Sequence, residues 1–145
     1  MSDKFTKAFI AGLGASIIMN LFNFISFYVL HFSSVRYLDY ASIALYGSKP
    51  ESFLAAAFAQ LAQILFSGFL GMVMLYYLSV VGQDNVLLKG WIFSFMAWFV
   101  IFGIGLLFKL PLLEKVPTNT AISGFMSASI YGITAAWLLT WLEQK

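Results

Sequence analysis

The sequence predicts an all-α, polytopic integral membrane protein in which four antiparallel transmembrane helices form one domain, residues 1–145. Four long stretches, 8–30, 54–80, 90–108 and 119–142, contain no Asp, Glu, Lys or Arg. A helix needs about 20 mainly apolar residues to cross the hydrocarbon core of a bilayer. The composition agrees, since 61% of the residues are hydrophobic, 10% are charged and the mean hydropathy is +0.90. The spans use nearly the whole chain, so no second domain is expected.

The same composition excludes several classes of function. The net charge of +2 is too small and too scattered for nucleic-acid binding. The absence of Cys removes disulfides, thiolate nucleophiles and Cys-ligated metals. No Gly-rich phosphate loop, nucleophile elbow or HExxH metal motif occurs. We therefore expect no cofactor, no metal site and no catalytic residue.

The first stretch, 8–30, follows Lys4 and Lys7 and could be mistaken for a signal peptide. Its apolar run is too long for a typical signal sequence, and no clear cleavage site of small residues follows it. We therefore expect this stretch to be a retained transmembrane helix.

The connection between the first two spans, 31–52, is too apolar for a freely solvated loop. Ser34 can begin a short helix there, and Gly47 can end it. We predict a short amphipathic helix that lies in the membrane interface between spans 1 and 2. An irregular loop packed over the bundle is the alternative.

The remaining connections are short and carry ordinary helix-ending signals. The polar run 82–85 predicts a tight turn, so spans 2 and 3 should form an antiparallel pair. Pro117 closes the third connection, and Thr118 or Asn119 can cap the fourth helix.

The distribution of Lys and Arg does not decide the orientation in the membrane. An even number of spans places both termini and the second connection on one side of the membrane. The two sides then tie: Lys4, Lys7, Lys89 and Lys145 on one, and Arg36, Lys49, Lys109 and Lys115 on the other. The pair Lys4 and Lys7 flanks the first span closely, so we expect a multi-pass cell-membrane protein with cytoplasmic termini. A dual-topology dimer is the alternative.

Polar residues inside the spans recur at helical spacings. Small and polar residues of this kind line membrane helix interfaces, where they allow close approach and hydrogen bonding. Counted from the centre of each span, Asn23 and Gln63 fall in one layer about four residues, or roughly 6 Å, off the midplane. We predict an interhelical polar layer with Asn23 and Gln63 as its best pair. The layer comprises Asn20, Asn23, Gln60, Gln63 and Ser127.

Two roles remain open for this polar layer. It can be structural, with each interhelical bond contributing on the order of 0.6 to 2 kcal/mol. It can also form a pocket or pathway for a small neutral or zwitterionic ligand. The spans contain no carboxylate, so coupling of transport to a buried acid is not expected.

The fourth span carries a small-residue ladder at intervals of four residues. Its members are Gly124, Ala128, Gly132 and Ala136. Such a ladder lets two helices approach closely, either within one bundle or between protomers. It therefore provides a candidate surface for a homo-oligomer or a membrane protein partner.

The single histidine offers one route to chemistry. His31 ends the first span, and Asp39 and Glu51 lie in the connection after it. An interfacial acid/base site could be built from these three residues, because histidine titrates near neutrality. A histidine at a helix end that faces headgroups is far commoner, so we do not expect an enzyme.

Several spaced features resemble one bacterial family. They are His31-Phe32 at the end of span 1, Tyr46-Gly47, Gly90-Trp91, Asn119-Thr120 and Tyr131-Gly132. In this order they resemble the YqhR-type four-span membrane proteins of spore-forming bacteria, over most of the chain. The resemblance implies a bacterial plasma-membrane location, and it carries over no activity and no functional residue.

Two hypotheses of function follow. The first is a non-enzymatic membrane protein that acts through partner or self association, using the small-residue ladder and the interfacial connection. The second is a small permease or ligand-binding bundle that uses Asn20, Asn23, Gln60 and Gln63. Replacing Asn23 and Gln63 together with Leu would spare the first activity and abolish the second.

Overall fold

The computed structural model describes residues 3–31, 37–46, 50–82, 84–107 and 118–144. These residues are almost entirely helical and include no β-strand. The elements are α1 (Lys4–Phe24), a π-helical continuation η1 (Ile25–Val29), α2 (Tyr37–Tyr46), α3 (Phe53–Val81), α4 (Val86–Leu107) and α5 (Thr118–Glu143). The all-α prediction is confirmed, and the four charge-free stretches fall on the long helices.

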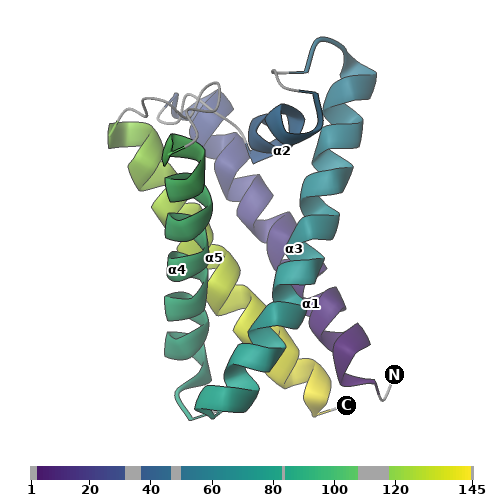
Figure 1. The fold of residues 1–145 in the computed structure, drawn as a ribbon, viewed down its shortest axis with the longest axis vertical. Helices are drawn as coiled ribbons and strands as arrows, with labels where there is room; N and C mark the ends of the chain where they lie inside the picture. Colours follow the sequence, from purple (N-terminus) through teal and green to yellow (C-terminus); the bar gives the residue numbers. More distant parts are fainter. Residues whose placement is uncertain (1–2, 32–36, 47–49, 83, 108–117, 145) are drawn as a thin grey trace.

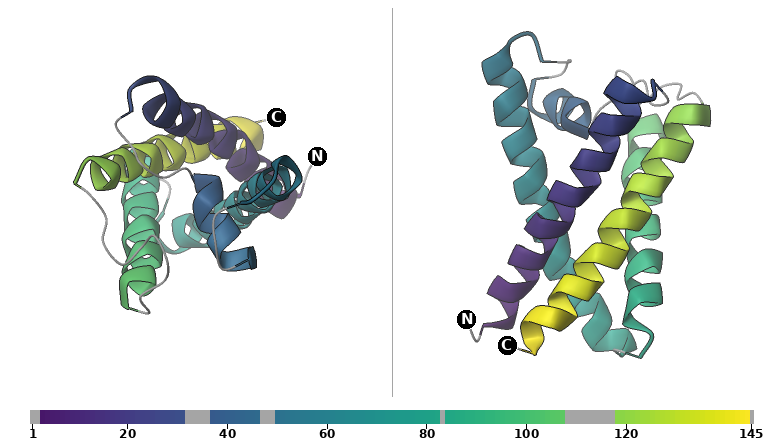
Figure 2. Two further views of the ribbon diagram at one scale, coloured as in Figure 1. Left: turned by 90° about the horizontal axis from the view of Figure 1, so that it is seen from above. Right: turned by 180° about the vertical axis from the view of Figure 1, so that it is seen from behind.

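Successive long helices run in opposite directions, as expected for four antiparallel helices (Figure 1). Both termini lie at one end of the bundle together with the turn between α3 and α4, whereas α2 lies across the opposite end. α1 and α5 lie side by side along most of their length (Figure 2). α4 packs on α5 and diverges from α3 above the turn that joins them.

Helix ends follow local capping chemistry. Asp3 caps α1, because its carboxylate accepts hydrogen bonds from the Phe5 N–H at 3.0 Å and the Thr6 hydroxyl at 2.7 Å. α1 therefore starts four residues before the expected span and includes Lys7, which is buried. Ser52 caps α3 by accepting from the Ala55 N–H at 3.1 Å.

The turn after α3 needs a backbone conformation that glycine adopts readily. Gly82 has φ 86°, and Asn85, another residue tolerant of positive φ, has φ 55°. The ammonium of Lys89 donates to the carbonyls of Val81 at 2.9 Å and Gly82 at 3.1 Å. Two of the carbonyls left open at the end of α3 are thereby satisfied.

The short helix expected between spans 1 and 2 appears as α2. Its expected boundary residues, Ser34 and Gly47, lie outside the described residues, as does Pro117. α2 is in contact with α3 and buries Asp39, Ser42 and Ile43. It is thus packed on the bundle through one face.

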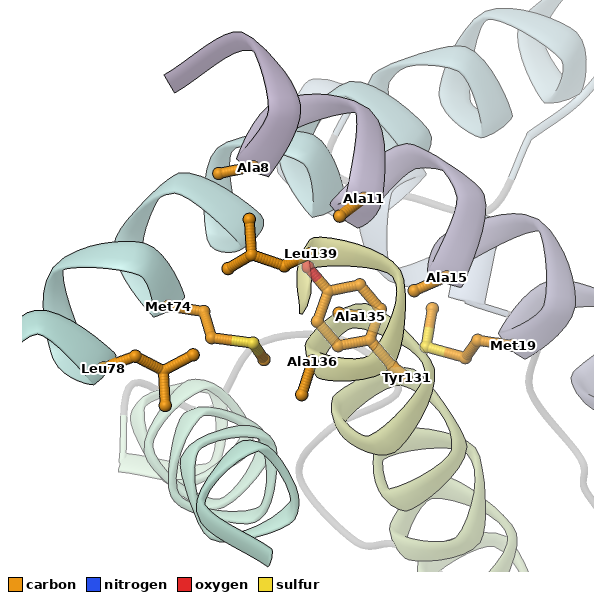
Figure 3. Close-up of a cluster of buried hydrophobic side chains, with 10 residues drawn as sticks. All are labelled: Ala8, Ala11, Ala15, Met19, Met74, Leu78, Tyr131, Ala135, Ala136 and Leu139. Atoms are coloured by element: carbon orange, nitrogen blue, oxygen red, sulfur yellow. The ribbon is translucent and has the colours of Figure 1, made fainter. Parts of the chain in front are cut away.

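The distribution of side chains is inverted relative to a water-soluble domain. Large apolar residues cover the outside, with Phe53 89% and Val80 84% exposed. The interior is built mainly from Ala, Gly and Ser, and Met74 and Leu78 are the large apolar side chains that are fully buried there. Figure 3 shows this core, in which alanines of α1 face side chains of α3 and α5.

Among the residues that the structure describes, three helical segments are long and apolar enough to cross a membrane. They are Lys4–Val29, Phe53–Val81 and Thr118–Glu143. Among the described residues, Val86–Ile101 of α4 forms a shorter apolar helix.

Candidate functional site

Two glycines set the contact between α1 and α3. A Cβ atom on Gly12 would overlap the backbone of Ser67 and Gly68, and one on Gly71 would overlap the carbonyl of Ala8. The two backbones therefore touch at this crossing. Close approach lets short polar side chains further along both helices reach each other.

Gln63 on α3 is the hub of the hydrogen bonds that form there. Its side-chain oxygen accepts from the Asn20 amide at 2.8 Å, from the Gln60 amide at 3.3 Å and from the Ser16 hydroxyl at 3.4 Å. Its own amide donates to the Ser67 hydroxyl at 3.1 Å. We call Ser16, Asn20, Gln60, Gln63 and Ser67 the carboxamide cluster.

The carboxamide cluster extends to α5 through a tyrosine. The Tyr131 hydroxyl donates to the carbonyl oxygen of Ser67. Its ring is buried among side chains of α1, α3 and α5 (Figure 3). Tyr131 was not among the predicted site residues. Its signal in the sequence is a single phenol in the middle of an apolar span, where the hydroxyl requires a partner.

The predicted pairing of Asn23 with Gln63 is wrong in register. The residue of α1 that bonds to Gln63 is Asn20, one helical turn earlier. Asn23 is buried and has partners of its own. The predicted pairing counts residues from the centre of each span, which holds only for parallel helices. In the structure α1 begins at Lys4 and crosses α3 at an angle.

Ser127 also makes no hydrogen bond to the carboxamide cluster. Its side chain is fully buried on α5, and its hydroxyl makes no hydrogen bond to any described residue. The layer expected from the sequence therefore comes together as Asn20, Gln60 and Gln63, with Ser16 and Ser67 added.

Two acceptors in the carboxamide cluster have no partner. They are the side-chain oxygens of Asn20 and Gln60, both buried and without a hydrogen bond among the described residues. The amide of Asn20 is fully engaged, because it donates to the Ser16 carbonyl at 2.8 Å as well as to Gln63. Most buried polar atoms in proteins are paired, so unpaired acceptors need an explanation.

The small-residue ladder of the fourth span lies inside the bundle. Gly124, Ala128, Gly132 and Ala136 are all buried. A Cβ atom added to Gly90 of α4 would lie 2.6 Å from the Ala136 Cβ and 2.7 Å from the Gly132 carbonyl oxygen. The Ser94 hydroxyl donates to the Ala128 carbonyl at 2.7 Å. The ladder thus packs α4 against α5 within one chain.

A cavity of about 400 Å³ lies between the helices, with α3 and α4 forming most of its wall. None of the described residues that line it is charged. Its apolar wall includes Ala62, Phe66, Leu70, Ala97 and Ile101, and its polar groups come from Gln63, Ser67, Ser94, Trp98 and Tyr131. Phe66 and Ile101 in its wall are exposed, and the cavity is partly open rather than enclosed. We call this space the central cavity.

The three residues considered for acid/base chemistry have unlike surroundings. His31 and Glu51 are exposed, whereas Asp39 is buried on α2. Among the described residues, no three His, Asp or Glu side chains are grouped as a metal site requires. The carboxamide cluster and the central cavity are therefore the candidate site.

Comparison of the chain with protein-family models, with curated proteins and with solved structures gives no match.

Proposed function

We propose that this protein is a multi-pass membrane protein that binds a mainly apolar small molecule in the central cavity. In this proposal the four long helices cross the bilayer of a bacterial cell and α2 lies in the interface. The Lys4 and Lys7 pair favours termini on the cytoplasmic side. The inverted distribution of side chains supports insertion, because lipid solvates exposed Phe and Leu while buried Asn and Ser and half-buried Gln bond to one another.

The central cavity is the observation that carries the proposed binding function. Its volume of about 400 Å³ lies within the range of about 300–1,000 Å³ typical of small-molecule pockets. Apolar cavities stay dry and accept apolar molecules. Because the cavity is partly open and Phe66 and Ile101 in its wall are exposed, a ligand dissolved in the bilayer could enter sideways.

The geometry favours ligand binding over self-association. The small-residue ladder that could have joined two copies is already covered by α4. A zwitterionic ligand, which the sequence left open, is disfavoured because the part of the cavity wall that the structure describes carries no charged side chain. Burying an unpaired charge in such surroundings costs more free energy than the apolar contacts return.

Quenching of tryptophan fluorescence tests this proposal, because Trp98 lines the central cavity. We expect 1-bromododecane to quench the purified protein in detergent with a saturable component. Ala97→Phe fills the cavity and should remove that component. Ile133→Phe is the matched control, since Ile133 is exposed on the outer surface of α5. Quenching of the unmodified protein that rises only linearly with 1-bromododecane would refute ligand binding.

A further inference from the structure

We infer that the ligand of the central cavity is an unsubstituted alkyl chain, and that Ser94 and Tyr131 exclude chains that carry a hydroxyl along their length. This inference rests on the proposed binding function and names the chemical class of the ligand. Membrane lipids and free hydrocarbons both supply such a chain.

The first support is the shape of the cavity wall. On α3 the lining residues extend from Ala62 to Leu70, which at about 1.5 Å per residue is roughly 12 Å along the helix. On α4 they extend over a similar length, from Ser94 to Ile101. The wall therefore follows the direction of the helices, which is also the direction of the lipid chains in a bilayer that these helices cross. A linear chain suits such a space.

The second support is that each hydroxyl in the described part of the wall already donates a hydrogen bond within the protein. The Ser94 hydroxyl of α4 donates to the Ala128 carbonyl of α5 at 2.7 Å. The Tyr131 hydroxyl of α5 donates to the Ser67 carbonyl of α3. The Ser67 hydroxyl donates to the Gln63 main-chain carbonyl at 3.0 Å. A hydroxyl has one hydrogen, so these three groups keep no donor for a ligand.

The polar atoms of the wall are also largely withdrawn from the cavity. Ser67, Ser94 and Tyr131 are only 2%, 3% and 4% exposed. The indole nitrogen of Trp98 is buried, and the side-chain oxygen of Gln63 already accepts three hydrogen bonds. Apolar atoms therefore make up nearly all of the surface that faces the cavity. A ligand hydroxyl placed there would lose its bonds to water without replacing them, which costs free energy.

Ser94 and Tyr131 are thus specificity-determining residues, because each covers a backbone carbonyl of a residue in the wall. Ser94→Ala would leave the Ala128 carbonyl without its side-chain donor. Ser94 and Ala128 both line the cavity, so the space vacated by the hydroxyl adjoins it and a ligand hydroxyl can take over the bond. Tyr131→Phe would free the Ser67 carbonyl in the same way and keep the ring.

Competition between probes of equal chain length tests the inference. Dodecane and dodecan-6-ol would each displace 1-bromododecane from the purified protein in detergent, with partition measured separately in protein-free micelles. We expect dodecan-6-ol to bind at least about tenfold more weakly than dodecane after this correction, a difference of about 1.4 kcal/mol. A didodecanoyl phospholipid distinguishes the two sources of the chain. Displacement by this lipid supports a lipid chain, and displacement by dodecane without it supports a free hydrocarbon.

Two variants locate the discrimination. Ser94→Ala and Tyr131→Phe should each reduce the preference for dodecane over dodecan-6-ol at least about threefold, the effect of one hydrogen bond regained by the alcohol. Ser79→Ala is the matched control and should leave the preference unchanged. The Ser79 hydroxyl also donates to a backbone carbonyl, that of Tyr76 at 2.6 Å, but Ser79 is exposed and does not line the central cavity.

The outcomes separate this inference from the proposed function. Equal binding of dodecane and dodecan-6-ol by the unmodified protein would overturn the inference, as would a preference that is unchanged in both Ser94→Ala and Tyr131→Phe. Displacement of 1-bromododecane by dodecane in those cases would leave the proposed function standing. Failure of every probe to displace 1-bromododecane would overturn the proposed function itself.

Discussion

The side-chain amide of Asn20 on α1 donates a hydrogen bond of 2.8 Å to the side-chain oxygen of Gln63 on α3. Asn20→Leu removes this donor and leaves the Gln63 oxygen with weaker partners at 3.3 and 3.4 Å. We expect a loss of about 0.6–2 kcal/mol in the free energy of unfolding, the range for interhelical bonds in membranes. Unfolding by SDS in mixed micelles measures it.

A double-mutant cycle isolates the bond between the two side chains. Asn20→Leu, Gln63→Met and the double variant should show non-additive losses, because both single changes remove the same hydrogen bond. Losses that simply add would contradict a direct bond between these residues.

Gly132 should tolerate no larger residue, because a Cβ atom there would overlap Ser94 and the Gly90 carbonyl. We expect Gly132→Ala to destabilise the protein by about 1–3 kcal/mol, as overpacking of cores does. Thermal unfolding of the variant and of the unmodified protein in detergent measures this loss of stability.

Gly103 on α4 is the matched control for Gly132, since a Cβ atom added to it would meet nothing within 4 Å. Gly103→Ala should be neutral or should stabilise α4 by up to about 1 kcal/mol, through the greater helix propensity of alanine. Equal effects at the two glycines would show that the contact between α4 and α5 is looser than described.

Lys89 should stabilise the turn between α3 and α4 through its bonds to the carbonyls of Val81 and Gly82. Lys89→Met removes both bonds and the favourable charge at the end of α3, and should cost about 0.3–1 kcal/mol. Lys89→Arg retains the charge and should lose less. Hydrogen exchange of the amides in the last turn of α3 measures the local effect. Exchange in both variants at the rate of the unmodified protein would exclude a capping role.

The start of α1 should depend on pH through Asp3. Hydrogen bonds from the Thr6 hydroxyl and then from the Phe5 N–H hold the pKa of Asp3 below its ordinary value of 3.8. Because the folded pKa is the lower one, the cap contributes fully above the unfolded pKa and is lost as the pH falls through the folded pKa. The chemical shift of the Phe5 amide proton should follow this titration.

Asp3→Asn is the control for that titration. Asparagine also caps helices but does not ionise in this range. The variant should retain the capped start of α1 without the low-pH transition. A transition that persists in Asp3→Asn would assign it to another group.

The sequence predicted the helices well because each span is specified locally. In a stretch without charges such as 54–80, a helix pairs the polar groups of the backbone within the stretch itself. The observed helix α3 differs from this stretch by one residue at each end. The start of the first helix was predicted too late, because the cap formed by Asp3 extends the helix through Lys4 and Lys7. Charged residues next to an apolar run do not themselves end a helix.

The sequence named three polar residues of the candidate site, but it did not predict which of them bond to each other. Asn20, Gln60 and Gln63 were all among the expected polar residues, because their spacing places them on inward stripes. Which residue of α1 meets Gln63 depends on the angle and height at which α1 crosses α3, and those follow from the contacts of Gly12 and Gly71. The part played by Tyr131 depends in the same way on the position of α5.

The amino-acid sequence by itself determined the number and approximate bounds of the long helices, their alternating directions and the residues that carry inward polar groups, because these depend on local hydropathy, helical period and turn length. Only the tertiary structure decided that Asn20 meets Gln63, that the small-residue ladder is covered by α4, and that a cavity remains where α3 and α4 diverge. The physical reason is that small residues permit close approach without specifying a partner, so packing of all the helices at once selects which faces touch and where space is left.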